Sequence, residues 1–293
     1  MTSPAQPGQR VVVTGASGRL GPAVVEHLAA HGWDVVATDR VAPPRPLPGK
    51  FVRADLGELG QVTELLAGVD ESGPADAVVH LAAIPAPGMA PNSTTFANNV
   101  PATYNVFRAA QVTGIRNVVW ASSETVLGLP FDVPPPYLPV DEEYPPIPQT
   151  TYSLGKTLEE EMAQHLTRWD PQLKAVALRF SNVMLPEDYA RFETWQDDPA
   201  ARRWNLWGYI DARDGAQAVR LALEATFTRF EAFIVANADT VMRRDSAELA
   251  AAEFPGVRLH RPLRGRETLL SIDKARRMLG YEPQHSWLDE VRD

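Results

Sequence analysis

The sequence predicts an α/β protein built on a doubly wound parallel sheet. Apolar, β-branched runs such as Val11–Val13 and "DVVATD" are typical of buried parallel strands. Between them, Leu20, Val24 and Leu28 repeat at the period of a helix. A strand, a glycine turn, a helix and a second strand therefore follow one another between Arg10 and Arg40.

The bulk composition narrows the class of protein. The chain has 293 residues and is 44% hydrophobic, which allows one large α/β domain or two modest ones. A formal net charge of −9 without a basic run argues against a nucleic-acid partner. The absence of cysteine excludes disulfides and thiolate chemistry, and no metal site is predicted. The polar N-terminus and the lack of a long apolar stretch lead us to expect a soluble, cytoplasmic protein without a membrane partner.

The turn after the first strand carries three glycines, Gly15, Gly18 and Gly21. Without a Cβ the turn can tighten, and its N–H groups can reach a pyrophosphate at the N-terminus of the helix. Asp39 ends the second strand, where a carboxylate can accept hydrogen bonds from a ribose diol. This arrangement predicts a dinucleotide site. Asp39 favours NAD because it would repel a 2′-phosphate, whereas Arg40 could accept one, so NADP stays possible.

A tyrosine and a lysine stand four residues apart at the start of the predicted helix "TTYSLGKTLEEEMAQHL". At this spacing Tyr152 and Lys156 share one helix face, about 5–6 Å apart at Cβ. A nearby cation lowers the pKa of a phenol, so the pair could donate and accept a proton near neutrality. The acidic run Glu159–Glu161 is expected to be a solvated face of the same helix.

The segments "TGASGRLG" and "YSLGK" together resemble the extended short-chain dehydrogenase/reductase family, which includes the NAD-dependent epimerases and dehydratases. The resemblance extends from Arg10 to Pro283. It includes "FVRADLGE", "AVVHLAAI", "NNVPATYNVFRAA", "VVWASSETVLG", "ALRFSNV", "GYIDARDGAQAVRLALEA" and "TLLSIDKARRMLGYEP". It implies a Rossmann fold and an NAD(P)-dependent enzyme.

The resemblance also implies roles for individual residues. Tyr152 would be the general acid/base at a carbinol or carbonyl oxygen, and Lys156 would bind the nicotinamide ribose and lower the pKa of Tyr152. Ser123, chosen over Ser122 by its offset from Val126, would hold the same substrate oxygen. Relatives often pair two of their helices in a homodimer, which makes a homodimer possible here. The predicted cofactor-binding residues are Gly15, Ser17, Gly18, Arg19, Leu20, Gly21, Asp39, Arg40, Asp55, Leu56, Leu81, Ala82, Ala83, Asn99, Tyr152 and Lys156.

Three departures from the family pattern bear on the substrate. Leu127 replaces the tyrosine of a Val-Tyr-Gly motif, and "NVMLPEDYARF" replaces Asn-Val-Tyr-Gly-Pro. The segment between Asn182 and Tyr209 is short for a segment that binds the UDP or dTDP part of a nucleotide sugar. This pattern is similar to uronate dehydrogenases of the same family. The main prediction is an NAD-dependent oxidoreductase acting on the CH–OH or carbonyl group of a small sugar-like substrate, a free aldose or uronate.

Several side chains are candidates for that substrate. Arginines in the short segment, Arg191, Arg202 and Arg203, could bind a carboxylate bidentately or pair with nearby acidic residues. Three tryptophans of the same segment, Trp195, Trp204 and Trp207, could cover the substrate or pack this small lobe on the main domain. Glu124 could orient a substrate hydroxyl or be solvated. The predicted substrate-binding residues are Ile84, Ser123, Glu124, Asn182, Arg191 and Trp195.

The predicted organisation has three parts. Residues 1–9 form a flexible tail, 10–182 and 208–236 an NAD-binding Rossmann domain, and 183–207 and 237–293 a small discontinuous substrate lobe. The Pro-rich run "GLPFDVPPPYLPVDEEYPPIPQ" is expected to be an ordered wall of the active site.

Two alternative functions stay open. One is an NAD-dependent 4-epimerase or dehydratase of a nucleotide sugar, which shares the first hydride step. The other is a catalytically inactive NAD(P)-binding regulatory protein, against which the presence of Ser123, Tyr152 and Lys156 argues.

Overall fold

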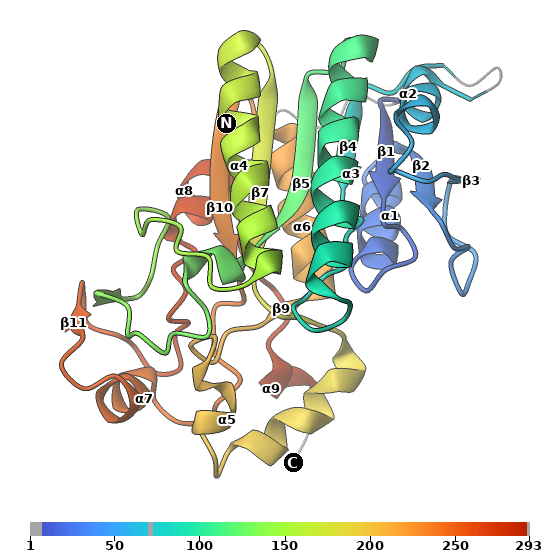
Figure 1. Cartoon of the computed structure of the whole chain (residues 1–293). Coiled ribbons are helices and arrows are strands. Elements are labelled where there is room, and N and C mark those ends of the chain that lie inside the picture. The colour runs from blue at the N-terminus through green and yellow to red at the C-terminus, as the bar shows by residue number, and fades with distance from the viewer. Residues whose placement is uncertain (1–7, 70–72, 292–293) are drawn as a thin grey trace.

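The computed structural model describes residues 8–69 and 73–291. Its central sheet has seven parallel strands in the order β10-β7-β5-β4-β1-β2-β3 (Figure 1). The predicted doubly wound parallel sheet is therefore confirmed. The strands are β1 (Arg10–Thr14), β2 (Asp34–Asp39), β3 (Lys50–Arg53), β4 (Ala77–His80), β5 (Asn117–Ser123), β7 (Lys174–Phe180) and β10 (Arg229–Val235).

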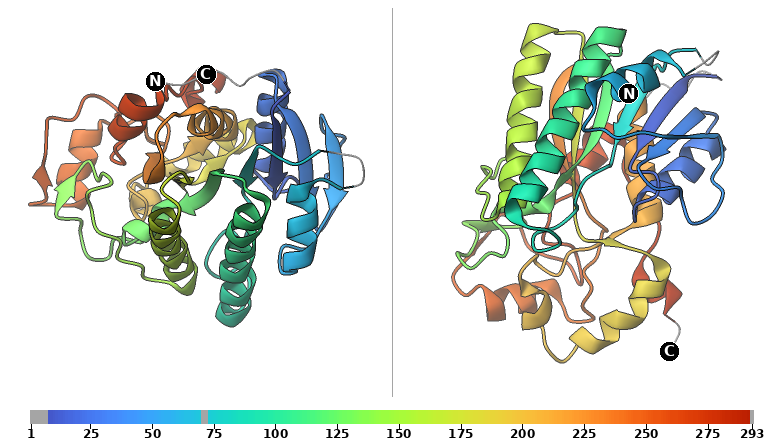
Figure 2. Two further views of the ribbon diagram at one scale, coloured as in Figure 1. Left: turned by 90° about the horizontal axis from the view of Figure 1, so that it is seen from above. Right: turned by 45° about the vertical axis from the view of Figure 1, so that its right-hand side comes forward.

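Helices cover both faces of this sheet (Figure 2). Successive residues of a strand point to opposite faces, so an apolar run such as that of β1 feeds two cores. Val11 and Val13 pack in the same core as residues of α1 (Gly21–Ala30) and α6 (Ala212–Glu224). Val12 packs in the second core, together with residues of the helices α2 (Leu59–Ala67), α3 (Asn92–Thr113) and α4 (Thr151–Trp169).

Helix α4 begins with a capping box that fixes its first turn. The hydroxyl of Thr150 accepts the N–H of Ser153 at 3.1 Å, and the Thr150 N–H donates to the Ser153 hydroxyl at 2.9 Å. Two N–H groups without helical partners are thereby satisfied. The cap holds Tyr152 in the first turn of the helix, one turn before Lys156.

Most of the short elements gather at the lower end of the sheet in Figure 1. The segment 183–211 begins and ends in the paired strands β8 and β9. The remaining short elements are η1 (Glu124–Leu127), β6 (Tyr137–Leu138), β8 (Val183–Met184), the 3₁₀-helix η2 (Pro186–Trp195), α5 (Ala200–Arg203), β9 (Ile210–Asp211), α7 (Ser246–Glu253), β11 (Arg258–Leu259), α8 (Asp273–Leu279) and α9 (Trp287–Glu290).

The Pro-rich segment is ordered because it pairs with the C-terminal part of the chain. Strand β6 pairs with β11 in parallel, and the His260 N–H donates to the Leu138 carbonyl at 2.9 Å. The Val140 N–H donates to the Leu269 carbonyl at 2.9 Å, and the Ser271 N–H donates to the Val140 carbonyl at 2.7 Å. The connection between β5 and α4 is thus held by residues more than a hundred positions later in the chain.

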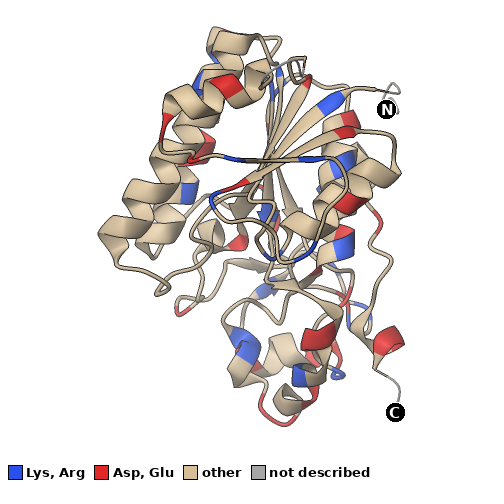
Figure 3. Cartoon of the chain, turned by 90° about the vertical axis from the view of Figure 1, so that its right-hand side faces the viewer, with Lys and Arg blue, Asp and Glu red and all other residues tan. Residues whose placement is uncertain are grey.

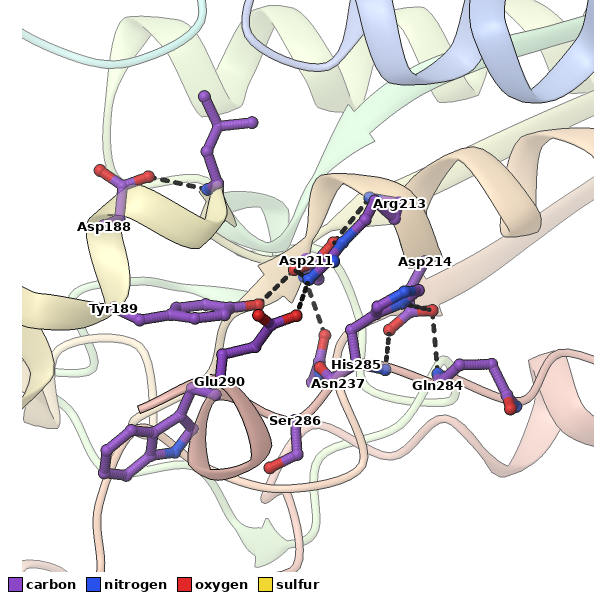
Figure 4. Close-up of polar contacts among 12 residues, drawn as sticks. Asp188, Tyr189, Asp211, Arg213, Asp214, Asn237, Gln284, His285, Ser286 and Glu290 are labelled. Carbon is purple, nitrogen blue, oxygen red and sulfur yellow. Dashed lines mark hydrogen bonds and ion pairs between the residues drawn. The ribbon is translucent and has the colours of Figure 1, made fainter. Parts of the chain in front are cut away.

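Polar contacts also join the predicted substrate lobe to β9 and α6 (Figure 4). The Tyr189 hydroxyl donates to Asp211, which accepts a further bond from Arg213 at 2.9 Å. Arg213 also contacts Glu290 of α9 at 2.8 Å. The division into a Rossmann domain and a lobe stays a prediction, and residues 1–7 of the predicted tail lie outside the described residues.

The surface carries charges of both signs. Acidic residues number 37 against 28 lysines and arginines, and Figure 3 shows the two kinds interspersed over one face. No helix within the described ranges combines the length and the apolar character needed to cross a membrane.

Candidate active site

A cavity of about 940 Å³ opens at the carboxyl ends of the parallel strands. This edge is where open α/β sheets bind ligands. The predicted site residues that line it are Gly15, Gly18, Arg19, Leu20, Gly21, Asp39, Arg40, Asp55, Leu56, Leu81, Ala82, Ala83, Ser123, Glu124, Tyr152, Asn182 and Arg191. The predicted residues that do not line it are Ser17, Ile84, Asn99, Lys156 and Trp195.

Two of the predicted residues that do not line the cavity form hydrogen bonds with residues of the loops around it. The Ser17 N–H donates to the Asp39 carboxylate at 3.1 Å, which orients that carboxylate at the end of β2. The Asn99 amide accepts the Ile84 N–H at 2.8 Å and donates to the Ile84 carbonyl at 3.0 Å. Ser17 and Asn99 therefore support the loops after β1 and β4 without lining the cavity.

The glycine turn is packed too tightly to accept side chains. Gly15 has a φ of +72°, and a Cβ on it would lie 2.5 Å from the Ala82 nitrogen. A Cβ on Gly21 would lie 2.3 Å from the Gly15 carbonyl oxygen. The turn thus brings bare backbone N–H groups to the start of α1, as a pyrophosphate requires. With the Asp39 carboxylate at the neighbouring strand end, these residues fit a dinucleotide.

Alanine at Gly15 or Gly21 is expected to lower both thermal stability and NAD affinity, because backbone atoms would have to move in each case. Gly60→Ala is the control, since Gly60 is in α2, does not line the cavity, and a Cβ on it would meet no atom within 4 Å. Thermal unfolding with and without NAD measures both effects. Equal unfolding temperatures for the three variants would contradict the close-packing argument.

Ser123 and Tyr152 both line the cavity and contact one another. The Ser123 hydroxyl accepts the N–H of Thr125 at 3.2 Å and its hydroxyl proton at 2.9 Å, and a side-chain hydrogen bond joins Ser123 to Tyr152. Burial raises the pKa of Tyr152 above its usual 10, while Lys156 and Ser123 oppose that shift. The predicted lowering of this pKa is therefore outweighed by burial, and the phenol is neutral in the protein alone.

Lys156 follows Tyr152 by four residues on α4 and is buried. Its ammonium donates to the Ala121 carbonyl at 2.8 Å and to the Glu159 carboxylate at 2.9 Å. Burial lowers the pKa of Lys156, but Glu159 and Tyr152 more than offset that effect, so the lysine stays charged.

The prediction that Glu159–Glu161 forms a solvated face is wrong for its first two residues. Glu159 and Glu160 are buried, and only Glu161 is exposed. Three consecutive helical residues cannot share one face, since neighbours on a face are three or four apart. Glu160 binds Arg179 through two hydrogen bonds of 3.0 and 2.7 Å and accepts the Ser122 hydroxyl at 2.6 Å.

Glu124 is buried at the edge of the cavity, so the alternative of a solvated carboxylate is wrong. It accepts the Ser181 hydroxyl at 2.5 Å and the Asn205 amide at 3.2 Å. Burial raises its pKa from 4.5 to about 7 against the opposing effects of Ser181, Asn205 and Arg202. The sequence reasoning missed Ser181 and Asn205, and only the position of Ser181 directly after a β-strand could have indicated it.

The three candidate arginines have different environments. Arg191 lines the cavity and its guanidinium is mostly exposed. Arg202 is buried, donates to the Gly208 carbonyl at 3.0 Å, and its guanidinium carbon lies 4.7 Å from the ring centre of Trp195. Arg203 contacts Glu253 at 3.7 Å and does not line the cavity.

Of the candidate tryptophans, Trp204 lines the cavity in place of Trp195. Trp195 stacks on Phe192 with 5.1 Å between ring centres. Trp207 is fully buried and donates its ring N–H to the Pro199 carbonyl at 2.8 Å, so it packs the lower region. None of residues 128–149, all of them described, lines the cavity, and the expected Pro-rich wall is therefore wrong.

The parallel sheet, the glycine turn and the tyrosine–lysine pair at its carboxyl edge are the marks of a dinucleotide-dependent α/β enzyme. The model of the NAD dependent epimerase/dehydratase family matches residues 11–236, and the chain belongs to this family. That membership confirms the predicted enzyme class and NAD as the cofactor.

Individual relatives carry epimerase names. UDP-glucose 4-epimerase 2 of Oryza sativa subsp. japonica is 28% identical over 68% of this chain, and the match spans only 50% of that protein. UDP-glucose 4-epimerase of Lacticaseibacillus casei is 25% identical over 96% of this chain and 94% of its own length. The chain thus spans about half the length of some curated relatives and nearly all of others.

Solved structures have the same fold. A UDP-galactose 4-epimerase superposes with a TM-score of 0.67 at 28% identity, and the match covers 96% of both chains. UDP-glucose 4-epimerase of Thermotoga maritima has a TM-score of 0.71 at 20% identity, also over 96% of both chains. A mutated uronate dehydrogenase has a TM-score of 0.67 at 22% identity and covers 97% of this chain and 85% of that one.

Proposed function

We propose that the protein is an NAD-dependent 4-epimerase of a nucleotide sugar. The observation that carries this proposal is the match to UDP-glucose 4-epimerases over nearly the full length of both chains. It favours the alternative stated above over oxidation of a free aldose or uronate, which was the main prediction. The shortness of the segment 183–207 is weaker support for a free sugar, since that segment still contributes Arg191 and Trp204 to the cavity.

The cavity has the extent that such a substrate needs. It runs from Asp39 and the glycine turn, past Ser123 and Tyr152, to Arg191 and Trp204. The first part suits the dinucleotide. In the second part, the exposed guanidinium of Arg191 is suited to a phosphate or carboxylate oxygen, and the Trp204 ring offers an apolar surface to a sugar or a base.

The residues of the chain would move a proton while the cofactor moves a hydride. NAD, when bound, accepts a hydride from a carbinol carbon and returns it. Tyr152 is the group placed to remove the hydroxyl proton and to give it back, and Ser123 would hold the same oxygen by a hydrogen bond. Epimerisation returns both hydride and proton to the sugar, so it produces no net NADH.

The test is to incubate the protein and NAD with UDP-glucose or UDP-galactose, and separately with a panel of free aldoses and uronates. We expect the UDP-sugars to interconvert, as followed by chromatography, without a net rise in nicotinamide absorbance at ~340 nm. The Tyr152→Phe variant is the control for protein-dependent turnover. A sustained absorbance rise with a free uronate, and no conversion of UDP-sugars, would overturn the epimerase and restore the dehydrogenase.

We further propose a homodimer formed through α3 and α4, which lie side by side (Figures 1 and 2). This face exposes Tyr104, Leu158 and Trp169, and Trp169 is 70% exposed. Such apolar groups on adjacent helices support a protein contact. Sedimentation equilibrium is expected to give a dimer for the unmodified protein and a monomer for Tyr104→Glu. Val133→Glu, at an apolar residue exposed elsewhere, is the control. A monomeric unmodified protein would contradict this proposal.

A further inference from the structure

The carboxylate of Glu159 has no role in the function proposed so far. It lies three residues after Lys156 on α4, is fully buried, and accepts a hydrogen bond from the lysine ammonium at 2.9 Å. Burying a carboxylate is costly unless it is paired, and this one is paired with Lys156 and has a further side-chain hydrogen bond to Thr103 of α3.

The contacts of Lys156 leave little freedom for its ammonium. An ammonium has three N–H bonds. One donates to the Ala121 carbonyl at the end of β5, at 2.8 Å, and a second donates to Glu159. Because the ammonium is tetrahedral, these two hydrogen bonds set the direction of the third N–H bond. Glu159 therefore fixes the direction in which the lysine can bind another group.

We propose that Glu159 is a positioning residue that holds Lys156 and weakens its pull on the Tyr152 proton. A lysine whose charge is balanced by a carboxylate stabilises a nearby phenolate less than an unpaired lysine does. The inference rests on Tyr152 being the acid/base of the proposed function. It does not depend on which sugar is the substrate.

The other charged groups around Tyr152 act consistently with this role. Burial raises the pKa of Tyr152 most, Lys156 lowers it, and Glu159 on α4 and Glu124 on η1 raise it. Glu160 faces Lys156 but is bound to Arg179. His80 of β4 is buried and neutral, because burial and Lys156 lower its pKa to about 3. Glu159 is the only one of these anions in direct contact with the lysine, within the described part of the chain.

The test is a direct titration of Tyr152 in the NAD-bound protein, which needs no substrate. The phenolate absorbance of Tyr152 is isolated by subtracting the titration of a Tyr152→Phe protein with the same background. Glu159→Gln removes the negative charge and leaves the phenolate as the counter-ion of Lys156. We expect its titration midpoint to fall by about one pH unit or more, the scale of a buried charge at this range.

Glu161→Gln is the matched control, because Glu161 is on the same helix with a side chain that is 59% exposed. Its midpoint is expected to equal that of the unmodified protein. If the Glu159→Gln protein does not fold, Glu159→Asp retracts the carboxylate from Lys156 by one methylene and is expected to lower the midpoint by a smaller amount. An unmoved midpoint in the folded variant would overturn the proposal.

The titration separates this inference from the proposed function. A midpoint that falls in Glu159→Gln supports the role of Glu159 even if the UDP-sugar assay is negative. Conversely, UDP-sugar turnover with an unmoved midpoint supports the epimerase and overturns the role of Glu159.

Discussion

Replacing Tyr152 with phenylalanine is expected to lower kcat by about 10²–10⁴-fold, the usual contribution of a general acid/base. The phenol lines the cavity beside Ser123 and is the proposed proton-transfer group, and phenylalanine keeps the ring while removing the hydroxyl. NAD affinity should stay close to that of the unmodified protein, because the glycine turn and Asp39 are untouched. Steady-state kinetics together with NAD titration measures both quantities.

Tyr137→Phe is the matched control. The Tyr137 hydroxyl donates to Asp141 at 2.7 Å, and Tyr137 does not line the cavity. This variant should keep the kcat of the unmodified protein. A loss of less than tenfold in Tyr152→Phe would show that another group transfers the proton.

Glu124→Gln is expected to stabilise the protein at pH 8 and to have little effect at pH 4. The pKa of Glu124 is raised from 4.5 to about 7 in the folded protein, so folding favours its protonated form. Its contribution to stability is therefore fully present below about pH 4.5 and is lost as the pH rises through about 7. Glutamine is uncharged at any pH and avoids this loss, which amounts to about 3 kcal/mol.

Urea unfolding at the two pH values measures the difference in the free energy of unfolding. The exposed Glu161→Gln again serves as control, and no comparable gain is expected from it. A Glu124→Gln protein that is less stable than the unmodified protein at pH 8 would mean that the ionised carboxylate is bound favourably by Ser181, Asn205 and Arg202.

The fold could be predicted from the sequence because its signals are local. The apolar run at Val11–Val13 defines a strand, and the spacing of Gly15, Gly18 and Gly21 defines the turn that follows it. For the same reason, most of the residues that line the cavity in the turns after β1, β2 and β4 could be predicted individually. The roles of these residues in binding remain predictions.

The rest of the site depends on contacts between distant residues. Glu159 lies three residues after Lys156 on the same helix, so its contact with that lysine is local and within reach of sequence reasoning. Glu160, in contrast, looks like a surface residue until α4 is placed against β7, which puts it beside Arg179. Glu124 and Asn205 are 81 positions apart and come together only in the folded chain. No local sequence pattern indicates such long-range pairs. For the same reason, the sequence could not show that Trp204, and not Trp195, lines the cavity.

The Pro-rich segment connects Ser123 to Tyr152, the two residues proposed to act on the substrate oxygen, and it pairs with residues 258–271. Ser123 and Tyr152 belong to the region matched by the family model, which ends at residue 236. The backbone bonds that brace the connection between them come from beyond that boundary. The matched region is therefore not a module that could be excised or transplanted intact. Changes accumulated in residues 258–271 are therefore expected to act on the connection between Ser123 and Tyr152, although these residues do not line the cavity.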